Sequence, residues 1–600
     1  MKRSTLLVAL GGALLFMPNS KQANADEYRD LYADTWAATD ALGRPLPMGN
    51  DVRPPQDDKF VGIFYFVWQG YHGKNEEGKN PLYDMTKILA ANPENPQWGP
   101  KGAFHWWAEP EVGYYKATDP WVARRNLRLL NAAGVDCLFM DVTNAFTYPD
   151  EMKVLFETAR QMRAEGNPTP QIAFLLNSNM VGTTQKLWDT YYKDGKYQEL
   201  WFRWDGKPLI LADKDEKTKE GAPIPTEIQD FFTWRKSWFE TYSKGWFGDG
   251  KGKWAWRDRT PQKPGLSPTG EVEQIAVGVA SHPIGENIGR SYANGKRVAI
   301  DKYDMTTTYD QGIQFQEQWD RALEVDPPLV FITGWNEWVA QRQTATADQV
   351  GKVNLVGRPM KAEGDTYFVD LYNAEFSRDV DMMKGGYTDN YYYQMVANIR
   401  KYKGARPVPV AGQEQTIAID GDFAPWREVW PEFRDSIGDT LHRDFDGWGD
   451  NHYTNTTGRN DITTAKVARD AGNVTFYVRT NEPLSPRTDA RWMMLFINAD
   501  QNAQTGWHGY DLRVGAVNDA LSPASVERWV KGSWQKVASA KLAYAGNELE
   551  LALPRSLFGA GALNFDFKWV DNANPDDITD WFLSGDCAPE RRFNYRFKTE

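Results

Sequence analysis

Short runs of consecutive apolar residues recur through the first two thirds of the chain, and polar residues follow each of them. The clearest runs lie at 61–68, 135–142, 172–176, 208–211, 275–280 and 329–335. A run without alternation is typical of a parallel strand that is covered on both faces. Segments with helical signals lie between the runs, and strands that alternate with helices predict a parallel α/β fold.

Several of the intervening helices have clear ends. Asp119 is a predicted N-cap, Pro120 occupies the first helical position and Gly134 ends the helix. Two further helices are predicted from about Pro149 to Gly166 and from Gly312 to Glu324. Each of them leads directly into one of the apolar runs, which is the order of elements in a βαβ unit.

The α/β pattern spans roughly Phe60 to Gly404, which is somewhat more than a (β/α)8 barrel requires and implies loop insertions. Besides the six clear strands, Lys253 to Arg257 is a candidate seventh, and one more is expected between Asp213 and Gly252. A doubly wound sheet would show the same alternation, but no glycine-rich phosphate loop follows any strand. We therefore predict an α/β fold of the TIM-type (β/α)8 barrel.

The pattern changes after a proline-rich linker at 405–411. Leu549, Leu551 and Leu553 alternate with Glu548, Glu550 and Ala552, and this period of two predicts half-buried strands. Val526 to Trp534 has the pattern of a hairpin that turns at Lys531-Gly532. Residues 412–600 are therefore predicted to form an all-β antiparallel sandwich.

The N-terminus has the pattern of a secretory signal peptide. Lys2 and Arg3 precede an apolar core from Leu6 to Met17, and an A-x-A cleavage site lies at 23–25. We expect residues 1–25 to be removed, residues 26–404 to form the catalytic domain, and the protein to be secreted or periplasmic. The apolar core is too short to span a bilayer, and no membrane insertion is expected.

Composition narrows the class of partner. The chain contains 26 Trp, 27 Tyr and 29 Phe, a surplus that suits sugar-binding surfaces, because flat rings stack on the C–H faces of pyranoses. The formal net charge of −12 argues against nucleic acid and anionic membranes as partners. Cys137 and Cys587 are the two cysteines, lie in different predicted domains and are expected to stay unpaired.

Glu337 is the central candidate for chemistry. The last apolar run opens onto Gly334-Trp335-Asn336-Glu337-Trp338, which places a carboxylate between indole rings at the carboxyl end of a barrel strand. Active sites of such barrels lie at that end. Glycosidic bond cleavage needs a carboxylate there, since its transition state carries positive charge on the sugar ring. The other interpretation is a buried structural glutamate paired with an arginine.

The segment Ile332 to Trp338 resembles the last barrel strand of glycoside hydrolase families 99 and 71. The resemblance implies a (β/α)8 barrel that acts on polysaccharides, on α-mannans in family 99 and on α-glucans in family 71. Glu337 matches the first glutamate of the family 99 motif Asn-Glu-Trp-x-Glu, in which both glutamates are catalytic. The second would fall at position 340, where this chain has Ala340, so the family's acid is absent from its expected place.

The second carboxyl must then come from another strand or loop. Asp141 leaves its strand as Glu337 leaves the last one, and it is the first candidate for the acid. Glu109, on the aromatic segment from Phe104 to Pro110, is the next candidate, with Glu111 beside it. Alternatively, Asp141 caps its own loop.

Other side chains at strand exits are candidates for substrate binding through stacking or hydrogen bonds. They are Tyr65, Trp68, His72, His105, Trp106, Asn144, Asn177, His282, Trp335, Asn336 and Trp338. The histidines have no ligand spacing such as H-E-x-x-H, and we predict no catalytic metal and no cofactor.

Short segments of the C-terminal part, at 417–421, 496–500 and 509–511, resemble the family 9 carbohydrate-binding modules. Asn498, Asp500 and Asn502 have the alternate spacing of a calcium loop, but the acidic residue expected later in the loop is missing, so no calcium is predicted there.

Together these features predict a secreted glycoside hydrolase that cleaves a polysaccharide or oligosaccharide by carboxylate chemistry centred on Glu337. The alternative is a non-catalytic glycan-binding protein on a barrel scaffold, which the absence of a second glutamate at position 340 favours. A polysaccharide lyase would need a cluster that neutralises a uronic acid, and Arg290 is the one obvious candidate near the strands.

Overall fold

The computed structural model describes residues 28–75, 77–239, 245–280, 288–292, 308–352, 360–368, 371, 373–515 and 523–600. The predicted signal peptide at 1–25 and the candidate residue His282 lie outside these ranges.

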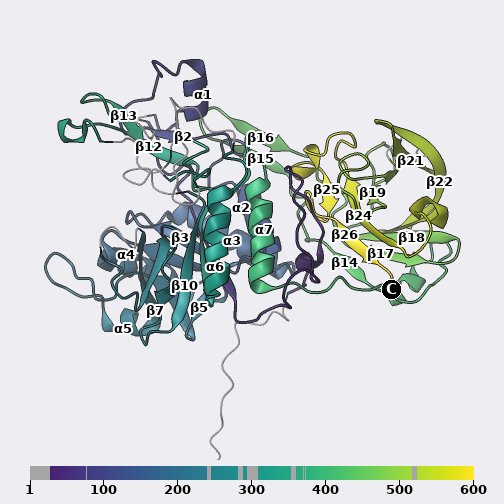
Figure 1. The fold of residues 1–600 in the computed structure, drawn as a ribbon, viewed down its shortest axis with the longest axis horizontal. Helices are drawn as coiled ribbons and strands as arrows, with labels where there is room; N and C mark the ends of the chain where they lie inside the picture. The colour runs from purple at the N-terminus through teal and green to yellow at the C-terminus, as the bar shows by residue number, and fades with distance from the viewer. Residues whose placement is uncertain are drawn as a thin grey trace, which may run out of the picture.

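Eight parallel strands form a nearly closed barrel of the TIM type (Figure 1). In spatial order they are β8 (Lys253–Arg257), β7 (Thr233–Phe239), β6 (Lys207–Leu211), β4 (Gln171–Leu176), β3 (Cys137–Val142), β1 (Phe60–Tyr65), β11 (Leu329–Trp335) and β10 (Val272–Gly278). The first and last of these also lie side by side, since Gln274 Nε2 on β10 donates to the Ala255 carbonyl on β8 over 2.7 Å. Short antiparallel partners are β5 (Arg203–Trp204) beside β6 and β9 (Gly265–Leu266) beside β10.

All six predicted strands and the candidate seventh are present, and β7 is the strand that was expected between Asp213 and Gly252. Some predicted bounds were too wide. β1 ends at Tyr65, so that Trp68 and His72 lie beyond it. β3 begins at Cys137, two residues after the start of the predicted run at 135–142. The barrel interior is densely filled. Gly62 leaves room for the Phe139 ring, since a Cβ at this position would lie 2.0 Å from it.

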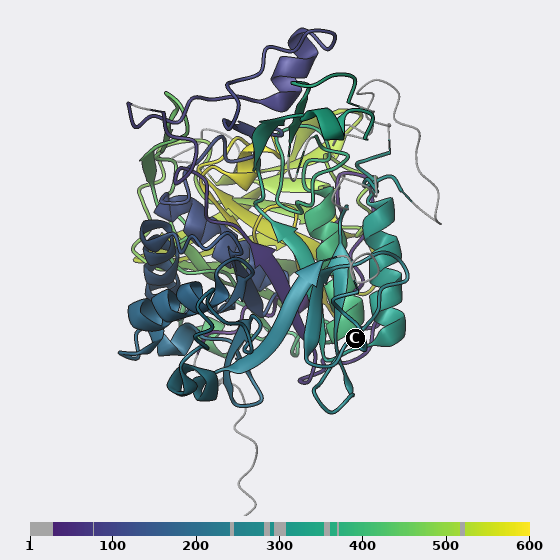
Figure 2. The same ribbon diagram turned by 90° about the vertical axis from the view of Figure 1, so that its left-hand side faces the viewer.

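Helices cover the outside of the barrel (Figure 2). They are α2 (Pro120–Ala132), α3 (Pro149–Ala164), α4 (Met180–Leu187), α5 (Thr226–Phe231), α6 (Ile313–Val325) and α7 (Asn390–Lys403). The predicted cap of α2 is confirmed, because Asp119 Oδ1 accepts the N–H of Trp121 over 3.0 Å. None of the helices among the described residues is long and apolar enough to cross a membrane.

A small sheet lies at the carboxyl end of the barrel strands and was not predicted. It consists of β13 (Thr366–Phe368), β12 (Val339–Thr344) and β2 (Phe104–Trp106), with α1 (Met85–Ala91) beside it (Figure 1). β12 follows the Glu337 segment directly and pairs with β2, so the loop that leaves β11 is tied to the aromatic segment predicted at 104–110.

The C-terminal part is a separate antiparallel β structure. One layer contains β14 (Glu432–Arg434), β17 (Ile462–Arg469), β18 (Asn473–Thr480) and β23 (Glu548–Pro554), and the other contains β21 (Ala524–Val530), β20 (Leu512–Val514), β19 (Met494–Asn498), β24 (Asn564–Asp571), β25 (Asp586–Ala588) and β26 (Tyr595–Lys598). The long strand β22 (Ser533–Ala545) pairs with β21 through its first half and with β23 through its second half. Phe476 packs on Phe565 and Phe567 of the facing layer.

The hairpin of β15 (Arg443–Asp446) and β16 (His452–Asn455) connects this β structure to the barrel (Figure 1). Arg443 Nε lies 2.8 Å from Asp119 Oδ2, at the N-terminus of α2. The hydroxyl of Tyr453 accepts the N–H of Tyr114 over 2.7 Å. The C-terminal part therefore supports the segment that carries β2. The domain bounds at 404 and 412 stay predictions.

Candidate active site

A cavity of about 650 Å³ opens at the carboxyl ends of the barrel strands. It is lined by Phe64, Phe66, Trp68, His72, Phe104, Asp141, Thr143, Asn144, Phe146, Trp238, Trp256, Glu337, Gln341 and Arg378. Two carboxylates and one guanidinium thus lie among aromatic rings contributed by four barrel strands or the loops that follow them. This combination of apolar walls with a few charged groups is typical of sites for small molecules and sugars.

The segment around Glu337 is fixed by hydrogen bonds on both sides. Asn336 adopts a left-handed conformation with φ of 61°, which asparagine tolerates better than most residues. Its N–H donates to Asp379 Oδ1 over 2.7 Å, and its side-chain oxygen accepts the N–H of Phe66 over 2.9 Å. The Glu337 carbonyl accepts Trp107 Nε1–H over 3.1 Å. The backbone of Glu337 therefore has a defined position at the cavity wall.

Glu337 forms a two-point ion pair with Arg378. Arg378 Nη2 lies 2.5 Å from Glu337 Oε1, and Arg378 Nε lies 3.0 Å from Oε2. Glu337 is 1% exposed and Arg378 is 2% exposed. The arginine predicted by the structural interpretation of Glu337 is thus present, but both side chains also line the cavity. Each carboxylate oxygen has two lone pairs, so the pair with Arg378 does not by itself use the full acceptor capacity of Glu337.

Asp141 lies near the end of β3 and faces the same cavity. Its Oδ1 accepts the N–H of Thr143 over 3.0 Å, so the loop-capping interpretation is also correct. One oxygen of the carboxylate orients the loop that carries Thr143, Asn144 and Phe146, and all three of these residues line the cavity. The structure therefore brings Asp141 and Glu337 to one site.

Glu109 is held elsewhere. Lys87 Nζ lies 2.8 Å from Oε2 of Glu109, and Lys384 Nζ lies 3.0 Å from Oε1. Partial burial opposes ionisation, but the two ammonium groups lower the pKa of Glu109 below its ordinary value. Glu109 is not among the residues that line the cavity, and a carboxylate with a lowered pKa is a poor proton donor.

Three of the candidate binding residues line the cavity, namely Trp68, His72 and Asn144. The His72 ring stacks on Phe104 with centroids 5.2 Å apart, and burial lowers its pKa, so that it is neutral near pH 7. Trp68 Nε1 is buried and has no hydrogen-bond partner among the described residues. It is therefore a donor available to a ligand.

Strand alternation explains two candidates that lie outside the cavity. Phe64 points into the barrel, so the next residue, Tyr65, points outward, where its hydroxyl accepts Asn126 Nδ2–H of α2 over 3.1 Å. Trp335 also points outward and packs edge-on against Tyr392 of α7, with centroids 6.3 Å apart. Both side chains are core residues.

The remaining described candidates lie outside the cavity. His105 accepts the Gly99 N–H at Nε2 and donates from Nδ1 to the Ala103 carbonyl, and burial lowers its pKa to about 4. Trp106 and Trp338 are fully buried, Asn336 is the positioning residue described above, and Asn177 is partly exposed beyond β4. None of these five residues lines the cavity.

A catalytic acid at position 340 would not face the cavity in this chain. Ala340 is fully buried in β12 opposite His105 of β2, while its neighbour Gln341 lines the cavity. Alternation along β12 thus places residue 341 toward the site and residue 340 into the core.

Several lining residues were missed by sequence reasoning. Trp238 and Trp256 lie at the ends of β7 and β8, the two strands with the weakest sequence signal. The alternation Lys253-Trp-Ala-Trp-Arg257 could have indicated Trp256. Arg378 had no such signal, because it lies outside any strand and reaches Glu337 only through the fold.

Arg290, the candidate cation for a lyase, is also placed elsewhere. It is fully buried between Tyr387 and Tyr391, with its guanidinium carbon 4.5 and 4.2 Å from the ring centroids, and it does not line the cavity.

No protein-family model and no curated protein match the chain. Among solved structures it is similar to two structures of the GH99 endo-α-mannosidase from Bacteroides thetaiotaomicron, one of them in complex with bis-tris propane. That complex shows 15% identity and a TM-score of 0.31 over 57% of this chain and 97% of the other. The second structure shows 15% identity and a TM-score of 0.32 over 58% and 98%. At this level of similarity, function has to be inferred from the cavity and its side chains.

Proposed function

We propose that the protein is a glycoside hydrolase that acts on a polysaccharide or oligosaccharide at the barrel cavity. The observation that carries this proposal is the placement of Glu337 and Asp141, from two different strands, on the wall of one aromatic-lined cavity. Glycoside hydrolysis requires two carboxyl groups that flank the scissile bond. The signal-peptide pattern at 1–25 leads us to propose that the enzyme acts outside the cytoplasm.

The surroundings of the two carboxyl groups suggest different roles. The Arg378 guanidinium pairs with Glu337 at two points, and such a cation favours the charged carboxylate. The charged carboxylate is the form that a nucleophile or a general base needs. Asp141 lies on the wall of the same cavity, and we assign it the role of general acid, which must carry a proton.

The aromatic walls supply substrate binding in this proposal. Phe146 is 42% exposed beside the cavity and its ring lies 4.9 Å from that of His72. Exposed rings of this kind stack on sugars, and the unpartnered Trp68 Nε1–H is suited to donate to a hydroxyl.

Replacing Trp68 with Phe keeps a ring in the wall and removes this donor. We expect KM, or Kd for a non-hydrolysed glycan, to rise by about 2- to 12-fold, the effect of losing one hydrogen bond, while kcat changes little. Steady-state kinetics and isothermal titration calorimetry would measure the change. Trp430→Phe is the control, since Trp430 is 53% exposed in the C-terminal part. Equal effects of both variants would contradict a role for Trp68 Nε1.

A non-catalytic glycan-binding protein is the second candidate. The bidentate Glu337–Arg378 pair favours it, because a glutamate held in this way can serve to shape the cavity. In that case the cavity would bind sugars through its aromatic walls without cleaving them.

A reducing-end release assay with the wild-type protein decides between these functions. The panel should include α- and β-linked polysaccharides, with α-mannans and α-glucans among them, and each glycan should also be tested for binding by calorimetry. Release of sugar from at least one glycan is the expected result. Binding without release would establish the glycan-binding alternative, and neither binding nor release would remove sugars from the proposal.

A further inference from the structure

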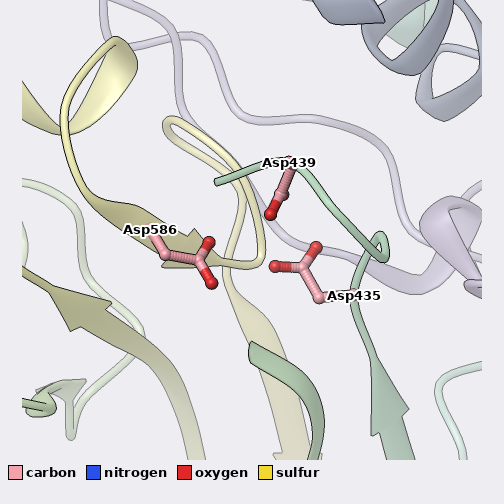
Figure 3. Close-up of side chains that lie close together, drawn as sticks. All are labelled: Asp435, Asp439 and Asp586. Carbon is pink, nitrogen blue, oxygen red and sulfur yellow. The ribbon is translucent and has the colours of Figure 1, made fainter. Parts of the chain in front are cut away.

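Three aspartates of the C-terminal part converge at the face that packs on the barrel. Asp435 follows β14, Asp439 lies in the next loop, and Asp586 begins β25. Each offers a carboxylate oxygen, and these oxygens lie within 4.8 Å of one another. In Figure 3 the three side chains point toward a common centre. Residues that are about 150 positions apart in the sequence are thus brought together by the two facing layers.

Asp435 lacks the partners that a buried carboxylate needs. It is 0% exposed, and neither of its oxygens has a hydrogen-bond partner among the described residues. Buried polar groups are nearly always paired, and an isolated buried carboxylate is strongly unfavourable. An unpartnered acceptor that points into a group of acceptors indicates a cation between them.

The neighbouring charges leave an excess of acid. Asp461 and Glu590 adjoin the cluster beside Asp439, so five carboxyl groups meet at this place. Arg128 of α2 lies 2.7 Å from Asp439 and 2.5 Å from Glu590, but forms no ion pair with Asp435 or Asp586. Other nearby cations are directed to other acceptors, and Arg29 binds the backbone carbonyl of Asp435 and not its carboxylate. Arg124 binds Glu165, Arg591 binds Glu111, and Lys568 donates to the Pro589 carbonyl.

We propose that Asp435, Asp439 and Asp586 bind one Ca²⁺ ion. Carboxylate oxygens are the ligands that hard cations prefer, and Ca²⁺ takes them at about 2.3–2.6 Å, so that oxygens on opposite sides of the ion are separated by up to about 5 Å. Mg²⁺ would require about 4 Å and near-ideal octahedral geometry. A cavity of about 40 Å³ lined by Asp439 and Asp586 adjoins the cluster and has room for water to complete the shell.

Such an ion would join the loop after β14 to β25, and through Arg128 it would adjoin α2 of the barrel. The inference does not depend on the proposed catalysis, because none of the three aspartates lines the barrel cavity. It also differs from the calcium-like spacing at Asn498, Asp500 and Asn502, where Asp500 accepts hydrogen bonds from Asn502 and Thr505 of its own loop.

The test is a titration of the full-length protein with CaCl2 after treatment with EGTA and gel filtration. Calorimetry and metal analysis are expected to show about one Ca²⁺ per chain, and the Tm is expected to rise with Ca²⁺ concentration. Asp435→Asn, which has the same shape and no charge, is expected to abolish this binding and the Tm response. Asp500→Asn, in the calcium-like loop, is the matched control and is expected to retain both. MgCl2 in place of CaCl2 is expected to produce a smaller Tm shift.

Two results would overturn the proposal. If the wild-type protein binds no Ca²⁺, protons and not a cation neutralise the cluster. In that case Asp435→Asn would be as stable as the wild type. Loss of Ca²⁺ in Asp500→Asn but not in Asp435→Asn would place the ion in the other loop. The wild-type titration requires no variant, so it decides the question even if Asp435→Asn fails to fold.

Discussion

Replacing Glu337 with Gln is expected to lower kcat/KM for the cleaved glycan by about 10³-fold or more, the range typical of removing a group that takes part directly in the chemistry. Gln has nearly the same shape as Glu but carries no negative charge. It can neither act as nucleophile or base nor stabilise the positive charge that develops on the sugar ring. Glycan binding is expected to persist, because the aromatic walls of the cavity remain.

The matched control is Glu109→Gln, which removes a carboxylate that lies outside the cavity and is expected to change kcat/KM less than twofold. Thermal unfolding of both variants should be recorded, since Glu337→Gln leaves the buried Arg378 without its anionic partner. Folded Glu337→Gln that cleaves at the wild-type rate would show that Glu337 serves only to hold Arg378.

Replacing Arg591 with Met is expected to destabilise the protein by about 3–5 kcal/mol, the usual result of removing one member of a buried ion pair. Arg591, in the C-terminal part, lies 2.7 and 2.8 Å from the two oxygens of Glu111, which precedes α2. Arg125 of α2 lies 2.8 Å from the same carboxylate and 3.2 Å from Asp381. The network thus joins the C-terminal part to the barrel, and its loss leaves buried charges incompletely paired.

Urea unfolding would measure this change, with Arg160→Met as control. Arg160, on α3, is 52% exposed and lies 2.9 Å from Glu199, and surface pairs of this kind contribute about 0–1 kcal/mol. Equal losses in both variants would mean that the Glu111 network adds nothing beyond an ordinary surface pair.

The effect of Arg591→Met should also depend on pH. Burial alone would raise the pKa of Glu111, but Arg591 and Arg125 outweigh it and hold the pKa below the ordinary 4.5. A carboxyl whose folded pKa is lowered contributes stability above its unfolded pKa, and this stability is lost as pH falls through the lower folded value. The difference between wild type and variant is therefore expected to be full above about pH 5 and to shrink in more acidic solution. A difference independent of pH would contradict this linkage.

Much of the fold could be predicted because the signals are local. Apolar runs without alternation marked six of the eight barrel strands, Lys253 to Arg257 was a candidate seventh, and Asp119 with Pro120 marked the start of α2. The alternation at Leu549, Leu551 and Leu553 marked β23. β7 was not marked in this way, since it carries Arg235, Lys236 and Ser237 in its middle and has no apolar run. Arg235 can be buried there because it forms an ion pair with Glu273, and only the fold brings these two residues together.

The site was predicted less completely than the fold. Position at a strand exit identified Glu337, Asp141, Trp68, His72 and Asn144 as neighbours. The same criterion wrongly selected Tyr65 and Trp335, which point away from the cavity. Successive residues of a strand point to opposite faces, but the sequence does not show which of two neighbouring residues faces inward at the strand's end.

By itself, the sequence determined the alternation of strands and helices in the barrel, the change to an antiparallel β structure in the C-terminal part, and the carboxylates at the strand exits, because each depends on residues that are close together in the chain. Only the tertiary structure decided that Arg378 pairs with Glu337, that Glu109 is held by two lysines outside the cavity, and that Asp435, Asp439 and Asp586 converge. Apart from Asp435 and Asp439, which are close in the chain, these contacts join residues from 22 to 275 positions apart. What brings such residues together is the packing of whole layers, which no local pattern records.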